Sequence, residues 1–384
     1  MEIGPSLYLG VPRVYSVPLS CTTLRVVIPT TQSVVQLRLP THVLLNPLSF
    51  LTSNPMPSAL ITGITGQDGS YLSEILLGKG YTVHGIVRRS SSLDRPRLLG
   101  QYNDPEIYGK RLFLHYADLS DSTSIRRILV NAKPDEVYHL AGQSHVGLSF
   151  EIPESTCELT AMGTLRIMEI LRDQPKNPKF LHASSREIFG TPEVSPQNES
   201  TPLNPNSPYG CAKSFATQMV RIYRESHGLF FCNAILYNHE SPRRAENFVT
   251  RKITLAAAKI KLGLQSKLTL GSIDSARDWG YAKEYAEAMW MILQHEKPDD
   301  YLLATGTSYT VREFTQAAFE HVGLNWENHV ELDQRFVRPA DPECLLGDAT
   351  KAKEILGWTA KTKMPELVKM MVDEDLKSLT QSTR

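Results

Sequence analysis

The sequence has few cysteines and no long apolar run. Its five cysteines are scattered along 384 residues without a Cys-x-x-Cys pair: Cys21, Cys157, Cys211, Cys232 and Cys344. This pattern argues against a disulfide framework and a zinc site, so we predict no metal and a reducing, cytoplasmic compartment. No apolar run reaches the roughly 18 residues that a membrane-spanning helix needs, so no membrane partner is expected.

The chain also lacks an excess of charge of either sign, because its 41 basic and 41 acidic side chains balance. A neutral chain gives no indication of broad nucleic-acid or anionic-membrane binding. The hydrophobic share of 41% and the charged share of 21% are typical of a soluble globular protein. The length suits one large domain or two smaller ones with an ample core.

The first 55 residues differ in composition from the rest. They contain one acidic residue, three arginines and no lysine, and they are rich in Ser, Thr, Pro and Val. A transit peptide fits in part, although arginines are few, and a secretory signal fits poorly. The favoured interpretation is an upstream start before a natural beginning at Met56, so residues 1–55 are expected to be a disordered extension.

A strand, a glycine-rich turn and a helix follow. The apolar run "ALITG" at 59–63 predicts a buried strand, and "SYLSEILLGKG" at 70–80 has apolar residues at helical spacing. Between them stand glycines three apart: Gly63, Gly66 and Gly69. A second strand is predicted at 81–87. This arrangement indicates a dinucleotide site in which the backbone approaches a pyrophosphate at the helix N-terminus, and it includes Gln67 and Asp68.

The end of the second predicted strand bears on the choice of cofactor. An NAD site often has an acidic residue here for the ribose 2′-hydroxyl, whereas this chain has Arg88, Arg89 and Ser90. Guanidinium groups suit a 2′-phosphate, so we predict NADP. A solvated basic turn is the alternative interpretation.

Further strands are predicted within 111–119, 135–147 and 179–185, and they alternate with helices. This rhythm indicates an α/β fold with a doubly wound parallel (Rossmann) sheet, in which ligands lie beyond the carboxyl ends of the strands. The residues at those ends are predicted to meet the adenine and the nicotinamide ribose. Asp118 and Leu119 are predicted to meet the adenine. The residues predicted by the nicotinamide ribose are Leu140, Ala141, Gln143 and Ser144.

The pair Tyr209 and Lys213 is the main catalytic signal. A spacing of four places both side chains on one face of a helix. A free phenol has a pKa near ~10, and a neighbouring ammonium together with an oxidised nicotinamide would favour the phenolate. Tyr209 could then take a hydroxyl proton while hydride leaves the same carbon. The alternative is an ordinary amphipathic helix, and the glycine-rich turn upstream argues against it.

These features resemble the extended short-chain dehydrogenase/reductase superfamily acting on nucleotide sugars. Within "HASSREIFG" at 182–190, the resemblance implies that Ser185 hydrogen-bonds the sugar 4-hydroxyl. A 4,6-dehydratase must remove a C5 proton made acidic by a C4 ketone, and Glu187 is the expected base. A 4-epimerase needs no such carboxylate. The alternative for Glu187 is an acid at a helix N-terminus.

Three longer segments resemble the GDP-mannose 4,6-dehydratase family: "NHESPRRAENFVTRKI" at 238–253, "GSIDSARDWGYAKEYAEAMW" at 271–290 and "RPADPECLLGDATKAKEILGW" at 338–358. The resemblance covers essentially residues 56–384. It implies that Ser185, Glu187, Tyr209 and Lys213 are catalytic and that His239 and Arg244 adjoin the cofactor. The implied substrate residues are Ser144, Asn238, Lys252, Arg277, Arg338 and Asp341.

The chain departs from the family at three positions, two in the segment 182–190 and one in 338–358. The family usually has threonine for Ser185, a small hydroxyl residue for Arg186 and glutamate for Asp341. Related dehydratases acting on other sugar nucleotides carry an acidic proton donor at the position of Arg186, and a guanidinium cannot donate a proton at working pH. Glu187 or a water would then protonate the leaving hydroxyl, or Arg186 marks a changed sugar.

The family resemblance also implies an organisation. Residues 56–237 plus 281–310 are expected to form the NADP-binding domain, and 238–280 plus 311–384 the nucleotide-sugar-binding lobe. Thr310 and Glu313 have the spacing of a helix capping box. The expected partners are GDP-mannose and further copies of the chain, as a homotetramer or homodimer. The alternatives are another dehydratase, an epimerase or a reductase of the superfamily, or an NADP sensor without turnover.

Overall fold

The computed structural model describes residues 23–27, 34–38, 56–89, 95–333 and 344–382. The chain divides into two compact units, Met1–Pro55 and Met56–Arg384. In the first unit, β1 (Thr23–Val27) pairs antiparallel with β2 (Val34–Arg38). The rest of the prediction for residues 1–55 lies outside the described residues, as do Ser90, Arg338 and Asp341.

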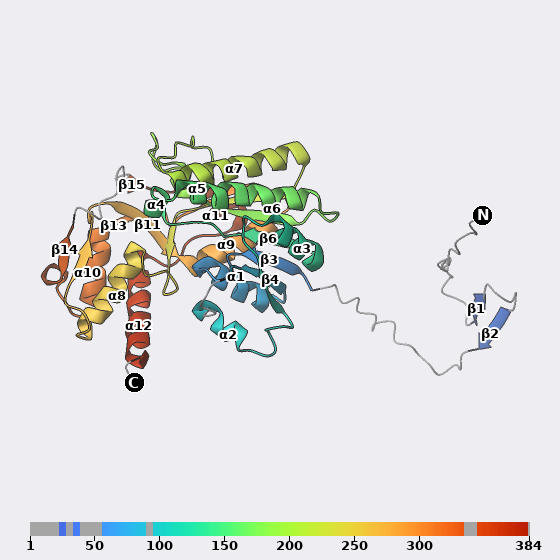
Figure 1. The fold of residues 1–384 in the computed structure, drawn as a ribbon, viewed down its shortest axis with the longest axis horizontal. Coiled ribbons are helices and arrows are strands. Elements are labelled where there is room, and N and C mark those ends of the chain that lie inside the picture. Colours follow the sequence, from blue (N-terminus) through green and yellow to red (C-terminus); the bar gives the residue numbers. More distant parts are fainter. Residues whose placement is uncertain (1–22, 28–33, 39–55, 90–94, 334–343, 383–384) are drawn as a thin grey trace. The chain divides into compact units, whose positions relative to one another are not determined.

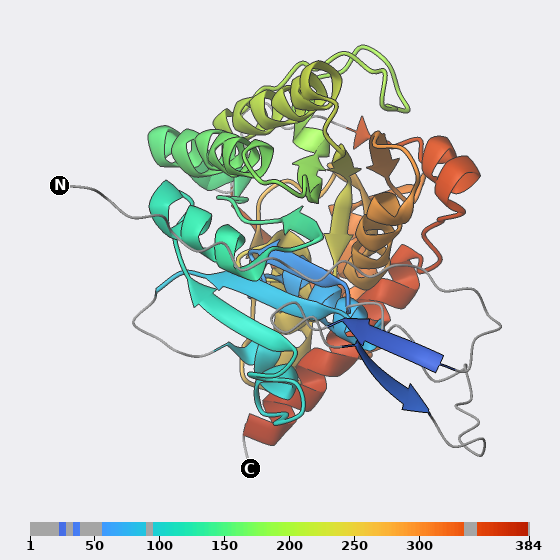
Figure 2. The same cartoon turned by 90° about the vertical axis from the view of Figure 1, so that its right-hand side faces the viewer.

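The second unit is built on a parallel sheet with the strand order β12-β8-β7-β6-β3-β4-β5 (Figures 1 and 2). The strands are β3 (Ser58–Thr62), β4 (Thr82–Val87), β5 (Leu112–Tyr116), β6 (Glu136–His139), β7 (Lys179–Ser185), β8 (Phe231–Leu236) and β12 (Asp300–Leu303). The predicted doubly wound fold is confirmed. The sequence analysis had not singled out β8, and it extended the segments of β5 and β6 past their true ends.

Helices cover both faces of this sheet, because successive strand residues point to opposite sides. On β3, Ile61 packs into a core with α1 (Gln67–Gly78) and α9 (Ala282–Gln294). Leu60 packs into the core on the other face with α3 (Ser122–Ala132), α6 (Gly163–Arg172) and α7 (Pro208–His227). Every residue of β6, β8 and β12 is buried, as expected for strands that helices cover on both faces.

A smaller core lies between α8 (Val249–Lys261), α10 (Val311–His321) and α12 (Met364–Ser382). Figure 1 shows these helices grouped beside the main sheet. The predicted capping box starts α10, where Glu313 N donates to Thr310 Oγ1 over 3.1 Å and Thr310 N to Glu313 Oε2 over 2.7 Å. We retain the division of 56–384 into two lobes as a proposal.

Short strands connect this region to the main sheet. β9 (Asn238–Glu240) follows β8 directly and pairs in parallel with β11 (Ala276–Tyr281). The other short strands are β10 (Leu268–Leu270), β13 (Ser308–Thr310), β14 (Val330–Leu332) and β15 (Cys344–Leu345). The remaining helices are η1 (Pro96–Leu98), α2 (Leu99–Tyr102), α4 (Val146–Ser149), α5 (Pro153–Cys157), the π-helical turn η2 (Glu158–Met162), η3 (Arg186–Ile188), η4 (Trp326–Asn328) and α11 (Thr350–Leu356). Within the described ranges, no helix is long and apolar enough to cross a membrane.

A buried ion-pair cluster joins β12 to α7. The carboxylate of Asp300 contacts Arg221 Nε at 2.5 Å and Arg224 Nη1 at 2.8 Å, and it accepts from Asn233 Nδ2 at 2.9 Å. Asp300→Ala should therefore lower the free energy of unfolding by about 3 kcal/mol, because the buried donors lose their acceptor. Urea unfolding measures this loss. Asp173→Ala, which removes an exposed pair, should cost only about 0.5 kcal/mol.

The same cluster has a defined pH dependence. Burial alone would raise the pKa of Asp300, but Arg224 and Arg221 hold it below its usual value. A carboxyl with a depressed folded pKa contributes its stability above the ordinary value of about 3.9 and loses it as pH falls through the lower folded value. The stability difference between wild type and Asp300→Ala should shrink only in that acidic range. An unchanged difference there would contradict the assignment.

Candidate active site

The glycine-rich turn lies at the carboxyl end of β3 and is compact. Gly63 has a φ of +75°, and Gly66 N donates to Gly63 O over 2.9 Å. A Cβ on Gly69 would lie 2.4 Å from Gly63 O, and one on Gly63 would lie 2.9 Å from Ala141 N. These positions require glycine, because the turn packs against itself and against the loop after β6. Gly63 and Gly69 thus serve internal packing, whereas Gly66, which precedes α1, is exposed at the helix N-terminus where a pyrophosphate would bind.

The loop after β6 is bound to the same turn. Leu140 N and Ala141 N both donate to Thr62 Oγ1 over 3.2 Å. The predicted residues Gly63, Leu140 and Ala141 thus meet beyond the ends of two adjacent strands. In a doubly wound sheet this is the place where a dinucleotide binds.

A buried network connects the start of α1 to β9. Asp68 Oδ2 lies 2.9 Å from His239 Nε2, whose Nδ1 lies 2.7 Å from Tyr237 O. Gln67 Nε2 donates to His239 O over 3.0 Å, and Gln67 Oε1 accepts from Ser241 Oγ over 2.7 Å. The side chains of Gln67 and Asp68 are therefore used within the protein, where they fix the segment that follows β9.

Asp68 and His239 each favour the charged form of the other. Burial alone would raise the pKa of Asp68 and lower that of His239. Their mutual attraction and hydrogen bond exceed this cost, so the pKa of Asp68 is lowered and that of His239 is raised. Prediction had assigned both residues to the cofactor site, and the structure brings them together there.

Tyr209 and Lys213 lie in the first turns of α7. Ser207 caps the N-terminus of this helix, where its Oγ accepts from Gly210 N over 3.0 Å. Both are buried. Lys213 Nζ lies 6.0 Å from the centre of the Tyr209 ring and donates to Ala183 O on β7 over 2.7 Å. The Tyr209 hydroxyl is hydrogen-bonded to the side chain of Ser185 at the end of β7. The expected grouping of Ser185, Tyr209 and Lys213 is present.

Burial governs the ionisation of this group in the protein alone. Burial raises the pKa of Tyr209 to about 12, and the hydrogen bond from Ser185 opposes it only in part. Burial also lowers the pKa of Lys213 to about 8. The expectation concerned the ammonium together with an oxidised nicotinamide, and it stays a prediction.

Glu187 lies beside Tyr209 in η3, directly after β7. Its backbone N–H donates to Ser185 Oγ over 3.3 Å, which turns the chain into η3. The side chain is only 8% exposed, and its charge raises the pKa of Tyr209, so the two groups sense each other. Arg186 Nη2 lies 2.8 Å from Glu187 Oε1. The carboxylate is thus near enough to affect the pKa of Tyr209, and it is paired with its chain neighbour.

Two further predicted residues lie around this group on the segment that begins with β9. The Arg244 guanidinium stacks 3.6 Å from the centre of the Phe248 ring, its Nε lies 3.1 Å from Glu240 Oε2, and its charge lowers the pKa of Tyr209. Asn238 Oδ1 is buried without a hydrogen-bond partner in the described part of the chain. A buried acceptor in this position is suited to a ligand hydroxyl.

The predicted adenine and ribose residues lie farther along the sheet edge. Arg88 and Arg89 are exposed just beyond β4. Asp118 Oδ1 accepts from Ser120 N over 3.0 Å and from Ser120 Oγ over 2.7 Å. The Ser120 N–H is the main reason that the pKa of Asp118 is lowered, and Arg88 contributes. Leu119 is buried.

Gln143 has a structural role. Its Nε2 donates to His145 O and to Thr156 Oγ1, each over 3.1 Å, and its Oε1 accepts from His145 N over 2.6 Å. These bonds shape the loop before α4 and leave Ser144 exposed. The Gln143 amide therefore fixes the loop, whereas the neighbouring Ser144 is exposed.

Lys252 and Arg277, predicted to hold the nucleotide diphosphate, lie in the smaller region. Lys252 Nζ donates to Thr269 O over 2.7 Å and borders a surface hollow of about 430 Å³ that Lys259 and Lys267 also line. Arg277 is buried on β11 and donates to Ala276 O over 2.7 Å. Glu246 also lines the hollow, so three cations and one carboxylate leave a net positive charge there that suits an anionic ligand.

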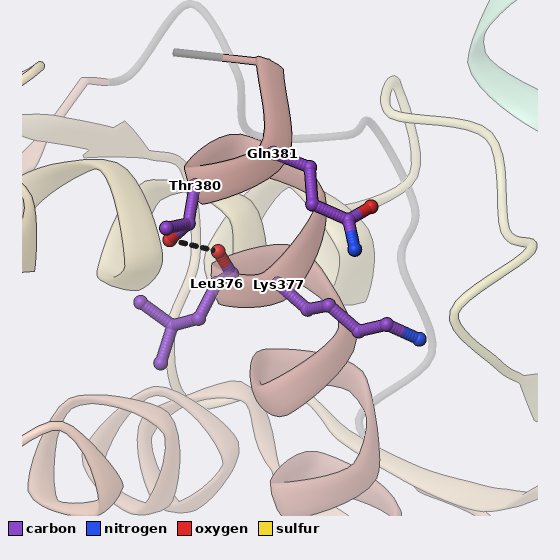
Figure 3. Close-up of a pocket in the computed structure, with 4 residues that line it drawn as sticks. All are labelled: Leu376, Lys377, Thr380 and Gln381. Atoms are coloured by element: carbon purple, nitrogen blue, oxygen red, sulfur yellow. Dashed lines mark hydrogen bonds between the residues drawn. The ribbon is translucent and has the colours of Figure 1, made fainter. Parts of the chain in front are cut away.

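A second hollow, of about 330 Å³, lies at the end of α12 (Figure 3). Its lining comes from one helix face, where Thr380 Oγ1 donates to Leu376 O over 2.7 Å and Lys377 and Gln381 extend outward. None of these residues was predicted to be functional, and the charges they offer do not converge. We assign this hollow no role.

Sequence reasoning missed two arginines that support the glycine-rich turn. Arg243 stacks 4.1 Å from the Tyr71 ring centre and binds Glu74 Oε1 at 2.6 Å on α1. Arg97 donates from Nε to Arg243 O over 2.6 Å and from Nη1 to Thr65 O over 3.3 Å. No spacing rule indicates such contacts, since those of Arg243 join residues more than 140 positions apart and the bond from Arg97 to Thr65 spans 32.

Together these residues fit a nicotinamide dinucleotide. Gly66 is exposed at the start of α1, exposed guanidinium groups follow β4, and Asn238 on β9 has a buried, unpaired acceptor. In the described part of the chain, no three His, Cys, Asp or Glu side chains are grouped as metal ligands.

Comparisons with known proteins agree with this geometry. The family model for GDP-mannose 4,6 dehydratase matches residues 60–371. The chain is 56% identical to GDP-mannose 4,6 dehydratase 1 of Arabidopsis thaliana, covering 84% of this chain and 90% of that protein. It is 47% identical to GDP-mannose 4,6-dehydratase of Vibrio cholerae, covering 83% and 94%. The structure of dTDP-glucose 4,6-dehydratase from Streptomyces venezuelae, with NAD bound, has a TM-score of 0.74 at 22% identity, covering 84% and 98%.

Proposed function

The chain belongs to the GDP-mannose 4,6-dehydratase family, and from that premise we propose how its own residues convert GDP-mannose to GDP-4-keto-6-deoxymannose. It is a nucleotide-sugar hydro-lyase that uses a nicotinamide cofactor. The observation that supports the residue assignment is the convergence of Ser185, Glu187 and Tyr209 at the carboxyl ends of the sheet.

The cofactor is proposed to be NADP. Oxidised nicotinamide supplies a place for the C4 hydride, which is returned at C6 in the same turnover. The glycines of the turn after β3 would hold the pyrophosphate, Asp118 and Leu119 would adjoin the adenine, and Arg88 and Arg89 would bind the 2′-phosphate. Residues Leu140, Ala141, Gln143, Ser144, His239 and Arg244 would surround the nicotinamide half.

The redox step starts at Tyr209. Ser185 binds the 4-hydroxyl, and Tyr209 takes its proton as the C4–H bond breaks. Because burial holds the pKa of Tyr209 at about 12, Tyr209 depends on Lys213, Ser185 and the positive charge of the oxidised ring to ionise. Lys213 is held for this by its bond to Ala183 O.

The elimination step belongs to Glu187. Once C4 is a ketone, Glu187 takes the C5 proton, the electrons of that bond form C5=C6, and the C6–O bond breaks. The departing oxygen takes a proton, supplied by Glu187 or a water, and leaves as water. When C6 is reduced, Glu187 returns a proton to C5. If Glu187 gave its first proton to the departing oxygen, it regains one from water, and the proton that Tyr209 took from the 4-hydroxyl is released to keep the balance. Its buried position beside Tyr209 supports this role.

Substrate binding is proposed to involve the segment after β9 and the smaller region. The buried Oδ1 of Asn238 would accept from a sugar hydroxyl, with Ser144 nearby. Lys252 and Arg277 would hold the diphosphate together with Arg338, and Asp341 would bind the ribose. Cations suit this task because each phosphate group offers charged acceptor oxygens.

The direct test is mass spectrometry of the protein given several nucleotide sugars. We expect GDP-mannose to lose one water with no lasting NADPH formation. Lasting formation or consumption of NADPH would indicate a reductase or another net oxidoreductase. Epimerised substrate would indicate an epimerase, dehydration of another sugar a different dehydratase, and binding without product an NADP sensor.

The cofactor choice gives a separate prediction. Replacing Arg88 and Arg89 together by alanine should weaken NADP binding by roughly 10- to 100-fold, because charge-assisted hydrogen bonds to the 2′-phosphate are lost. Calorimetric titration of cofactor-stripped protein with NADP and NAD measures this. NAD affinity should stay within about twofold, since NAD has no such phosphate. Equal losses for both cofactors would contradict the assignment.

A homotetramer or homodimer and a cytoplasmic location remain proposals. Large apolar side chains are exposed around α4 and on α7, among them Phe150, Ile152, Phe215 and Ile222. Burial of such side chains against another copy would remove them from water. Light scattering at several concentrations tests the assembly.

A further inference from the structure

Arg186 is a buried cation inside the catalytic group. It is 4% exposed, and Glu187, the residue it pairs with, is 8% exposed. Its Nη2 contacts Glu187 Oε1 at 2.8 Å, whereas its Nη1 is buried without a partner in the part of the chain that the structure describes. Burying a guanidinium costs several kcal/mol unless it is paired, so a position that only filled space would favour an apolar residue.

The pair is constrained by the backbone on both sides. Arg186 and Glu187 are consecutive residues of η3, and Ser185 Oγ fixes the turn by accepting from Glu187 N. Gly210 of α7 packs so closely that a Cβ there would lie 2.6 Å from Glu187 O. The backbone of Glu187 therefore has little freedom to move, and the guanidinium holds one of the two carboxylate oxygens.

Resting on the proposed function, we propose that Arg186 is a positioning residue that keeps the Glu187 carboxylate aimed at the C5 proton. A guanidinium cannot give up its own proton at working pH, so it assists the base and does not act as the acid. The proton that the departing oxygen needs must then come from Glu187 or from a water. The unpaired Nη1 is a donor suited to the same departing oxygen.

The inference predicts that Arg186 affects elimination and not hydride transfer. Tyr209 and Lys213, which start the redox step, make no hydrogen bond to Arg186 in the described residues. Tyr209 is bonded to Ser185, and Lys213 to Ala183 O. Arg186→Met removes the charge but keeps most of the buried volume. A charge-assisted hydrogen bond is worth enough to change a rate by roughly 10- to 100-fold.

The decisive experiment uses a partial reaction that needs no hydride transfer. The C5 proton of GDP-4-keto-6-deoxymannose lies next to the ketone, so holoenzyme in deuterated water should exchange it through Glu187. Mass spectrometry follows the uptake of one deuteron. In Arg186→Met we expect exchange and kcat to fall together by roughly 10- to 100-fold. Arg186→Lys, which keeps a cation, should recover part of both.

The matched control is Arg221→Met, which removes a buried arginine from the Asp300 cluster, outside the proposed catalytic machinery. It should lower stability without changing the exchange rate of folded enzyme. Wild-type exchange in Arg186→Met would overturn the inference, as would equal slowing of exchange and of reduced-nicotinamide formation. If instead Glu187→Gln exchanges normally, the base assignment itself fails, which is a different result from failure at Arg186 alone.

Discussion

Tyr209→Phe should lower kcat for GDP-mannose dehydration by roughly 10²- to 10⁴-fold, the range expected for loss of a general base. Phenylalanine keeps the buried ring of α7 and removes only the hydroxyl that Ser185 binds. No group remains to take the 4-hydroxyl proton, so the first hydride transfer should stop. In a single turnover, the near-ultraviolet absorbance of reduced nicotinamide should not rise.

A matched variant exists on the same helix. Tyr223 is also buried on α7, but its hydroxyl donates to Glu169, and it is outside the proposed site. Tyr223→Phe should keep kcat within about twofold while testing the general effect of removing a buried hydroxyl. Formation of reduced nicotinamide at the wild-type rate in Tyr209→Phe would contradict the role given to Tyr209.

Glu187→Gln should also lose roughly 10²- to 10⁴-fold in kcat, but at a later step. Glutamine has nearly the same shape and cannot accept the C5 proton. Hydride should still leave C4 for the nicotinamide. Without elimination no C5=C6 double bond forms to take it back, so bound reduced nicotinamide should accumulate. Rapid-mixing absorbance distinguishes this arrest from the one expected for Tyr209→Phe.

The control is a buried glutamate on the same sheet. Glu136 at the start of β6 accepts from Tyr138 and Gln294, and it takes no part in the proposed chemistry. Glu136→Gln should change stability without arresting turnover. If Glu187→Gln formed no reduced nicotinamide, or completed dehydration normally, the separation of redox and elimination between Tyr209 and Glu187 would be wrong.

Much of the fold could be predicted because its signals are local. The apolar runs, the glycine spacing and the capping box at Thr310 are properties of short segments, and the structure confirms the parallel sheet they indicate. The predicted cofactor residues lie together for a general reason. In a doubly wound sheet the carboxyl ends of the strands share one edge, so residues that follow strands meet there.

The ionisation of the site could not be predicted from spacing. The four-residue interval between Tyr209 and Lys213 indicates that they share a helix face, but it gives no measure of burial, which raises the pKa of Tyr209 and lowers that of Lys213. Contacts between distant segments were also missed. Asp68 with His239 and Arg97 with Arg243 depend on how β9 folds back over α1.

The role of Arg186 also depends on burial and contacts that sequence spacing does not give. Its sequence position marked it as a departure from the family, and the prediction left a changed sugar and a displaced proton donor both open. Only the distance from Nη2 to Glu187 and the burial of both groups indicate that the cation supports the base. A side chain that extends from a strand end can point to either side, and sequence alone does not decide which.

The central claim is that one hydride moves from C4 to C6 of the same substrate molecule. Tyr209 starts its transfer to the cofactor, and the elimination by Glu187 allows its return. GDP-mannose labelled with deuterium at C4 tests it most directly in a single turnover followed by mass spectrometry. The wild type should carry the label to C6 of the product, Glu187→Gln should leave it on the bound nicotinamide, and Tyr209→Phe should leave it at C4. Product from the wild type with the label lost to water, or still at C4, would contradict the account.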